Sequence, residues 1–246
     1  MRALSHYSAL LLLLWSCHTS RESQAPPISP AYNLPANENT PNPVAFGQLV
    51  DRYEAPTRME WQQPDRIIAR MGPLAGRRIA DIGAGTGFFS FRLARAGAEV
   101  IAIDIDPRFL QFIEQRRQEW PDSIAQRLTL RPADPELPPL SAQEVDGVLL
   151  VNTYAYLPNR PRYFKYVHDA LQPDGWLLVV DYKAGPQPVG PDAADKLPTS
   201  TIIAELEASG FHHMRVEDQV LPYQNLIWAF PTETDTLVST YNTLRQ

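Results

Sequence analysis

Cysteine and histidine are scarce in this chain of 246 residues, which contains one cysteine, Cys17, and five histidines. A single cysteine forms no internal disulfide, so disulfides do not stabilise the fold. It also leaves no set of thiolates that could bind a soft metalloid substrate. His212 and His213 are adjacent and His168 is isolated, so none has the spacing of a metal site or a catalytic triad. The sequence therefore predicts no metal centre.

Basic runs are also missing, and the formal net charge is −6. Proteins that bind nucleic acid usually present a dense basic surface to the phosphate backbone. The densest basic group in the later part of the chain is Arg160, Arg162 and Lys165, which is typical of a solvated helix face. We therefore expect no nucleic-acid partner.

The apolar run near the start, Ser8 to Trp15, is short and contains five consecutive leucines. It is too short to span a bilayer, which takes about 20 apolar residues, and it matches the core of a signal peptide. It ends at Leu14-Trp15-Ser16-Cys17, which resembles a bacterial lipobox, although the bulky Trp15 departs from the pattern. We expect residues 1–16 to be a signal peptide and Cys17 to carry a lipid that anchors an exported protein to a bacterial membrane. The alternative is a cytoplasmic protein with an apolar tail.

The composition divides the rest of the chain. Residues 17–45 are rich in Pro, Ser, Asn, Gln and Thr, and such a segment cannot bury enough apolar area to order itself, so we expect a flexible tether. Residues 46–232 are long enough for one α/β domain. Residues 233–246 form a C-terminal tail in this interpretation.

The most informative stretch is Ile79-Ala80-Asp81-Ile82-Gly83-Ala84-Gly85-Thr86-Gly87, in which an apolar strand ends in an acid and turns through three alternate glycines. Glycine allows positive φ and close approach of a ligand to the backbone. The helix that follows directs its unpaired N–H groups at the ligand. The dinucleotide fingerprint is the rival interpretation, but its third glycine stands five residues after the first, where this chain has Phe88.

This spacing resembles motif I of the class I S-adenosylmethionine (SAM) dependent methyltransferases, acid-x-Gly-x-Gly-x-Gly. The resemblance covers about residues 50 to 230 and implies SAM as the cofactor. It implies that the cofactor binds at the turn, with Asp81 near the ammonium group of SAM. The implied contacts at this turn are Asp81, Gly83, Ala84, Gly85 and Gly87.

Three further segments end in residues that suit the other parts of SAM. Asp104 ends a second buried strand, about 20 residues after the glycine turn, where an acid accepts both ribose hydroxyls. Ile105 is then positioned to lie against the adenine. By the resemblance, Asp134 accepts a hydrogen bond from the adenine amino group, and Asn152, after a fourth strand, faces the cofactor.

The pattern of elements predicts the fold. Short apolar strands are expected at 78–82, 99–103, 128–131, 145–151 and 176–180, with a helix over 53–71 before them and two final strands at 212–220 and 224–230. Alternating strands and helices indicate a parallel sheet. The final pair resembles the antiparallel hairpin of the methyltransferases. We therefore predict an α/β, Rossmann-like, seven-stranded methyltransferase fold whose mostly parallel sheet ends in a C-terminal antiparallel hairpin.

Two pairs of residues are candidates for a lid or an acceptor pocket. Trp61 and Gln62 stand just before a proline that begins a helix, in the segment that often covers the methionine end of SAM in this family. Tyr154 and Tyr156 follow the fourth strand, at the edge where α/β proteins bind ligands. Core packing explains Trp61 and the tyrosines equally well. A Pro- and Gly-rich loop over 184–198 is expected to roof the pocket.

The resemblance implies an enzyme that transfers a methyl group from SAM to a small molecule, a lipid or an envelope component. Such a transfer mainly requires close positioning and exclusion of water, and the sequence identifies no catalytic residue. The expected export leaves open a lipid-anchored binding module with this fold and no transfer activity, because SAM is made in the cytosol. A nicotinamide oxidoreductase is disfavoured by the glycine spacing and the final hairpin.

Overall fold

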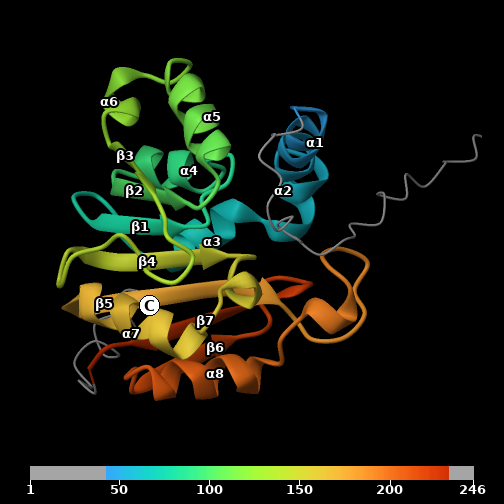
Figure 1. Ribbon diagram of the computed structural model, residues 1–246, viewed down its shortest axis with the longest axis vertical. Helices are drawn as coiled ribbons and strands as arrows, with labels where there is room; N and C mark the ends of the chain where they lie inside the picture. The colour runs from blue at the N-terminus through green and yellow to red at the C-terminus, as the bar shows by residue number, and fades with distance from the viewer. Residues whose placement is uncertain (1–42, 233–246) are drawn as a thin grey trace, which may run out of the picture.

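The computed structural model describes residues 43–232, which form one sheet with helices on both faces (Figure 1). The first helix, α1 (Pro43–Tyr53), begins before the domain start predicted at residue 46. The proposed signal peptide, Cys17, most of the tether and the C-terminal tail lie outside the described residues.

The sheet has seven strands in the order β3-β2-β1-β4-β5-β7-β6. The first five strands pair in parallel, and β7 pairs antiparallel with both β5 and β6, which confirms the predicted fold class. The strands are β1 (Arg78–Ile82), β2 (Glu99–Asp104), β3 (Leu128–Pro132), β4 (Val145–Val151), β5 (Leu171–Tyr182), β6 (His213–Glu217) and β7 (Gln224–Phe230).

The chain continues from β1 to β2 on one side of β1, and from β4 to β5 on the other side. The connections after the adjacent strands β1 and β4 therefore lead in opposite directions along the sheet. The crevice at such a switch point, outside the carboxyl ends of the strands, is where open α/β sheets bind ligands. The helices between and after the strands are α4 (Ser90–Arg95), α5 (Pro107–Arg117), α6 (Asp122–Ala125), α7 (Arg160–Ala170) and α8 (Thr199–Ala208), with short 3₁₀ turns at Tyr154–Tyr156 and Ala193–Asp195.

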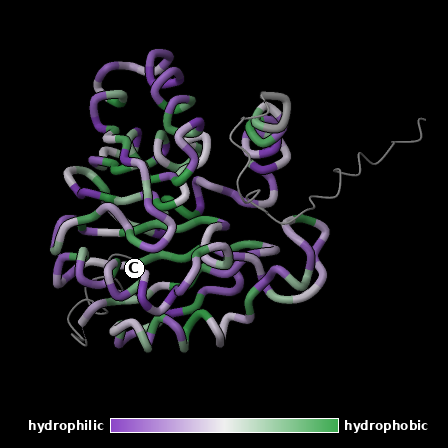
Figure 2. Tube along the Cα trace, viewed as in Figure 1, coloured by the Kyte–Doolittle hydropathy of each residue, from purple (hydrophilic) through white to green (hydrophobic). Residues whose placement is uncertain are grey.

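The core lies in two layers, one on each face of the sheet. On one face α4 and α5 pack through Phe91, Leu93 and Ile113, and on the other α7 and α8 pack through Phe164 and Leu206. Adjacent residues of one strand, such as Leu149 and Leu150, point to opposite faces and are both fully buried. This explains why the parallel strands are continuously apolar rather than alternating. Figure 2 shows the hydrophobic segments concentrated along the central strands.

The helix predicted over residues 53–71 is wrong as a single element. It is replaced by α2 (Thr57–Gln62) and α3 (Pro64–Arg70), which follow the end of α1. Gln63 separates them with a φ of 46°. The reason is Pro64, which has no N–H to donate and disfavours helical geometry in the residue before it. The break lets α2 turn away from α3 toward the carboxyl edge of the sheet.

The fifth strand is longer than predicted. The sequence predicts a strand over 176–180, but β5 runs from Leu171 to Tyr182. Its first part pairs Leu171 with Val145, and a shift of register follows before Gly147 pairs with Trp176. The irregularity absorbs Pro173, Asp174 and Gly175, whose types favoured a turn. At the other end the strand carries Asp181 and Tyr182 out to the ligand edge.

We predict that Leu149→Ala in β4 lowers the free energy of unfolding by about 2–5 kcal/mol, because it leaves a cavity between fully buried neighbours. The matched change Leu137→Ala, at a side chain that is 45% exposed, should stay within about 0.5 kcal/mol. Chemical denaturation measures both. Equal effects of the two substitutions would show that β4 is not at the centre of the core.

Candidate functional site

A cavity of about 460 Å³ lies outside the carboxyl ends of the parallel strands. This is within the range of small-molecule sites, roughly 300–1,000 Å³. In Figure 1 the blue α1 and α2 and the orange loop that contains Ala193–Asp195 both lie beyond this end of the sheet. Each contributes to the lining, α1 through Tyr53, α2 through Arg58 and Trp61, and the loop through Gly190 and Asp195. The N-terminal helices therefore form part of the site.

The glycine turn forms the floor of the cavity. Gly83, Gly85 and Gly87 all have positive φ, between 54° and 77°. A Cβ at Gly83 would also stand 2.3 Å from the Thr153 hydroxyl oxygen, so that position excludes a side chain twice over. Residues 83 and 84 are held at the strand end because their amides donate to the Ile103 carbonyl over 2.9 and 3.0 Å. The turn brings the backbone itself to the cavity surface at Gly83, Ala84 and Gly85.

Asp104 lines the cavity and is only 7% exposed. Its Oδ2 accepts a hydrogen bond from the Gly85 amide over 2.8 Å, and its Oδ1 accepts one from the Asp106 amide over 2.9 Å. Burial raises the pKa of Asp104 to about 6, while the two amide bonds act to lower it. Each carboxylate oxygen still has a second lone pair, so the side chain can hold the turn and accept from a ligand at once.

Asp81 is buried beneath the glycine turn and is not among the lining residues. Its Oδ2 accepts a hydrogen bond from the Ser90 hydroxyl over 2.6 Å. Burial, with a smaller effect of the nearby charge of Asp104, raises the pKa of Asp81 to about 6, while the hydrogen bond from Ser90 acts to lower it. Asp81 therefore joins the end of β1 to the start of α4, and its predicted contact with a ligand ammonium group stays a prediction.

The structure brings Ile105, Asp134 and Asn152 to the cavity lining. Ile105 is 37% exposed, directly after Asp104. Asp134 is exposed, and its Oδ1 accepts from the Glu136 amide over 2.8 Å, which fixes the loop after β3. Asn152 has a φ of 57°. These residues end or follow β2, β3 and β4, as the predicted arrangement requires.

Gln62 does not line the cavity. It is fully buried, accepts from Arg58 Nε over 2.5 Å and donates from Nε2 to Gln224 Oε1 over 3.0 Å. Gln224 in turn donates to the Asn152 side-chain oxygen. The result is a chain of four side chains, Arg58–Gln62–Gln224–Asn152, that joins α2 to β7 and to the end of β4. The role of Gln62 is to fix α2 in place, and Arg58 and Asn152 at its two ends both line the cavity.

Of the remaining predicted aromatic residues, two line the cavity and one lies in the core. Trp61 lines the cavity and its ring lies 5.9 Å from that of Tyr182, and Tyr156 lines it and is 44% exposed. Tyr154 is fully buried outside the lining, stacks on Phe164 and donates its hydroxyl to Glu205 over 3.0 Å. In the first turn after β4 the 3₁₀ geometry thus sends Tyr154 to the core and Tyr156 to the cavity.

Several polar and aromatic cavity residues were not identified from the sequence, among them Tyr53, Arg58, Asp181, Tyr182 and Asp195. Two of them end β5, at the edge where ligands bind, so the strand end was a usable signal for Asp181 and Tyr182. Asp195 lies in the loop over 184–198 that is predicted to roof the pocket, whereas Tyr53 and Arg58 come from segments without a recognisable motif. Burial lowers the pKa of Arg58 to about 10, and its guanidinium lies 4.0 Å from the centre of the Phe88 ring.

Asp181 has one oxygen in a hydrogen bond and one without a partner. Its Oδ1 accepts from the Tyr182 amide over 2.7 Å, whereas its Oδ2 is buried and has no hydrogen-bond partner. The amides of Tyr154 and Ala155 act to lower the pKa of Asp181, but burial outweighs them and raises it to about 6. A carboxylate in this state can gain from a ligand that donates to it.

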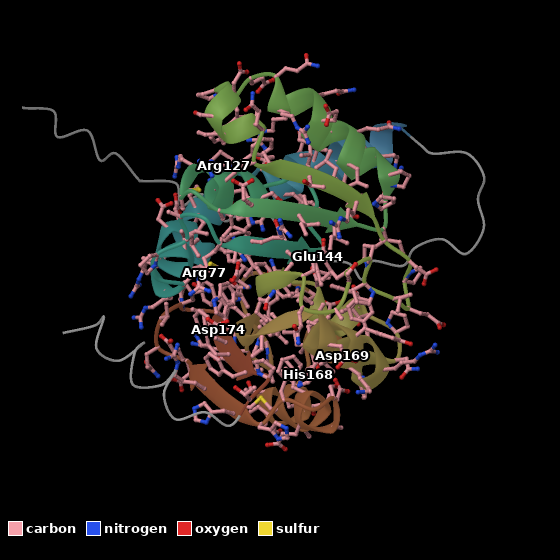
Figure 3. All side chains as sticks on the ribbon, turned by 90° about the vertical axis from the view of Figure 1, so that its left-hand side faces the viewer. Arg77, Arg127, Glu144, His168, Asp169 and Asp174 are labelled. Atoms are coloured by element: carbon pink, nitrogen blue, oxygen red, sulfur yellow. The ribbon has the colours of Figure 1, made fainter. Side chains whose placement is uncertain are left out.

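The opposite edge of the sheet holds charged residues that pair with one another. Arg77 lies 3.1 Å from Asp146 and 3.7 Å from Asp174, and the view in Figure 3 shows Arg77 above Asp174 on this side. A small hollow nearby is lined by Glu144, which is 2.6 Å from Arg131. The charges at this edge therefore largely neutralise each other.

Within residues 43–232, no three His, Cys, Asp or Glu side chains come together as metal ligands. In the same range no helix is both long and apolar enough to cross a bilayer.

Comparison with known proteins gives a consistent picture. The family model "Methyltransferase domain" matches residues 80–177. The chain is 28% identical to the tRNA U34 carboxymethyltransferase of Chromohalobacter salexigens, over 72% of this chain and 56% of that protein. It is 32% identical to the demethylmenaquinone methyltransferase of Tropheryma whipplei, over 46% of this chain and 44% of that protein. The chain thus spans about half the length of these curated relatives.

Among solved structures, a SAM-dependent methyltransferase from Aquifex aeolicus has a TM-score of 0.66 at 19% identity, covering 77% of this chain and 98% of that one. The SAM complex of the glycopeptide N-methyltransferase MtfA has a TM-score of 0.57 at 19% identity, covering 69% and 93%. These likenesses show the methyltransferase fold. Together with the domain match, they support a SAM-dependent methyltransferase with SAM as its cofactor.

The buried carboxyl groups make stability depend on pH. The pKa of Asp81 is raised in the folded protein to about 6, from an ordinary value of 3.8. Between pH 5 and 7 the folded protein must give up the Asp81 proton, which the unfolded chain has already lost. The free energy of unfolding should therefore fall by about 1 kcal/mol over this range because of this group. We predict that Asp81→Asn, which keeps an acceptor for Ser90, removes that part of the fall. Denaturation at both pH values measures it, and an identical fall in the two proteins would contradict the prediction.

Proposed function

We propose that this chain transfers the methyl group of SAM to a small-molecule or lipid acceptor. The observation that carries the proposal is the cavity at the switch point of the sheet, which joins the glycine turn and Asp104 at one end to an acidic and aromatic region at the ends of β4 and β5 at the other. A protein that bound only the cofactor would need only the end with the glycine turn and Asp104.

The residues fit SAM in their chemistry. Asp104 offers free acceptor lone pairs for the ribose hydroxyls. Ile105 and Asp134, at the ends of β2 and β3, suit the adenine by apolar contact and by accepting from its amino group. The backbone of Gly83 and Gly85 allows the methionine part to approach closely. Arg58 supplies a positive charge for its carboxylate.

When bound, SAM supplies a methyl group already activated by the positive sulfur. The chain then has to position the acceptor and exclude water. Trp61 and Tyr182 cover the cavity on the side of α2, and the Arg58–Gln62–Gln224–Asn152 chain fixes that cover.

The relatives suggest two acceptor classes, since one is named for tRNA and another for demethylmenaquinone. The net charge of −6 disfavours tRNA, because nothing in the composition offers the phosphates a basic surface. A small or lipid acceptor fits better with the aromatic part of the lining formed by Trp61, Tyr156 and Tyr182.

We further propose that Cys17 carries a lipid and that the protein is exported and held on a bacterial membrane, because Leu14-Trp15-Ser16-Cys17 resembles a lipobox. This location supports a second candidate function, a lipid-anchored binding module without methyl transfer, because SAM is made in the cytosol. A protein that binds SAM but methylates no acceptor would favour that candidate.

Calorimetric titration with SAM and with its demethylated product, S-adenosylhomocysteine, tests the cofactor. We predict micromolar binding and a weakening by about 1.5–3 kcal/mol in Asp104→Asn, which loses a charge-assisted acceptor. Asp174→Asn, at the opposite edge of the sheet, is the matched control and should bind as the wild type does. Absence of binding to a folded sample would overturn the enzyme proposal, and equal affinity of wild type and Asp104→Asn would overturn the role of Asp104.

Metabolic labelling with a radioactive fatty acid in a bacterial host tests the anchor. We predict that the wild type incorporates the label and sediments with membranes, and that Cys17→Ser does neither. Cys17 is the only cysteine, so no other thiol can take up the lipid. An unlabelled wild type in the cytoplasmic fraction would replace export by the cytoplasmic alternative.

A further inference from the structure

The end of the cavity beyond β4 combines two acids with two tyrosine rings: Asp181 and Tyr182 from the end of β5, Tyr156 after β4, and Asp195 from the loop before α8. These groups are close enough to influence one another. Burial raises the pKa of Tyr156, and the charges of Asp181 and Asp195 raise it further. Asp181 and Tyr156 act in the same way on Tyr182. We call these four residues the acidic–aromatic cluster.

The cluster is separate from the part of the cavity assigned to the cofactor. Asp104 ends β2 and Asp181 ends β5, and β1 and β4 lie between them. With three strand spacings of about 4.8 Å each, the two strand ends are about 14 Å apart. The glycine turn after β1 lies between them. A ligand held at Asp104 and extending over the turn therefore leaves the acidic–aromatic cluster for a second molecule.

The two arginines of the lining also act on the tyrosines of the cluster, since Arg52 acts to lower the pKa of Tyr156 and Arg58 acts to lower that of Tyr182. Outside the lining, Lys196 Nζ lies 5.7 Å from the centre of the Tyr182 ring and donates to the Gly185 carbonyl. Within residues 43–232, none of these cations is paired with the two acids of the cluster. Arg58 is engaged by the Gln62 side chain and by the Tyr53 carbonyl, to which it donates over 2.7 Å, and it stacks over Phe88. Arg52 projects from α1 and is exposed to solvent. Among the described residues, neither Arg52 nor Arg58 forms an ion pair with Asp181 or Asp195, and the buried Oδ2 of Asp181 has no hydrogen-bond partner.

We propose that the methyl acceptor is an amine, which the acidic–aromatic cluster binds as its ammonium form through Asp181 and Asp195 and between the rings of Tyr156 and Tyr182. The inference rests on the proposed function and names its acceptor class. A neutral hydroxyl acceptor would leave two carboxylates uncompensated, whereas an ammonium group donates to carboxylates and is attracted to the faces of aromatic rings.

Within this arrangement Asp181 has a second task. An ammonium nitrogen has no lone pair to form a new bond, so the bound acceptor must first give up one proton. The Asp181 carboxylate is positioned to take that proton. The neutral nitrogen then forms a bond to the methyl carbon with its lone pair while the carbon–sulfur bond breaks, which leaves S-adenosylhomocysteine and a methylated ammonium product. Asp181 returns its proton to solvent when the product leaves. The raised pKa of Asp181, about 6, makes the carboxylate a better proton acceptor than a solvent-exposed one.

A matched pair of probes tests the proposal: benzylamine, which is cationic at neutral pH, and benzyl alcohol, which has the same shape without the charge. Each is titrated by calorimetry into the full chain saturated with S-adenosylhomocysteine. We expect benzylamine to bind at least about tenfold more tightly than benzyl alcohol, a ratio that equals about 1.4 kcal/mol. Asp181→Asn should reduce the ratio to near one, and the exposed control Asp174→Asn should leave it unchanged.

A second variant keeps the test decisive if Asp181→Asn fails to fold. Asp195→Asn changes a half-buried side chain in the loop before α8 and should reduce the ratio by roughly threefold. Equal binding of the two probes to the wild type overturns the proposal, and so does a ratio that neither variant changes. Mass spectrometry after incubation with SAM and benzylamine should then show a product heavier by one methyl group in place of hydrogen.

The outcome also separates this inference from the proposed function. Titration with S-adenosylhomocysteine alone comes first, and a folded protein that does not bind it overturns the methyltransferase. In that case the probe titrations are repeated without it, and a retained preference for benzylamine would identify an amine-binding cavity without a cofactor. Binding of S-adenosylhomocysteine with no preference for the cation would leave the enzyme in place and remove only the amine.

Discussion

The hydrogen bond from the Gly85 amide to the Asp104 carboxylate, 2.8 Å long and buried, is the contact on which the site depends. It joins the turn after β1, which lies at the switch point, to the end of the neighbouring strand β2. Because the same carboxylate lines the cavity, the shape of the floor and the charge offered to a ligand are set by one side chain. The positive φ of Gly85 is what brings its amide to this acceptor.

The second constraint comes from the chain before the sheet. The break at Gln63 turns α2 over the carboxyl edge, and the buried Arg58–Gln62–Gln224–Asn152 chain then holds it there. Buried amides that lose a partner cost free energy, so α2 is fixed by the same groups that would be left unsatisfied if it moved. On this side the cavity is therefore bounded by a helix that is hydrogen-bonded to β7 and held in place.

The sequence was sufficient for the strands and for the residues at their ends. Buried parallel strands are continuously apolar, and Asp104 and Asn152 follow such runs directly, so their place at the ligand edge could be predicted. The direction of the side chains beyond the strand ends could not be predicted from the sequence. Tyr154 and Tyr156 stand in one short turn and point to the core and the cavity respectively. The structural role of Gln62 could not be predicted either. Its partner, Gln224, lies 162 positions away in the chain, and no local sequence pattern indicates such a contact.

The distribution of charge in the cavity follows from this arrangement. Its acids come from the ends of β2, β3 and β5 and from the loop before α8, whereas its arginines come from α1 and α2. The sheet edge is thus acidic and the helical wall basic. A ligand that spans the cavity meets carboxylates at both of its ends and a positive group between sheet and helices. The proposed pair of SAM and an amine matches this order. The ribose of SAM requires a hydrogen-bond acceptor, its carboxylate requires a cation, and the ammonium group of the amine requires an acid.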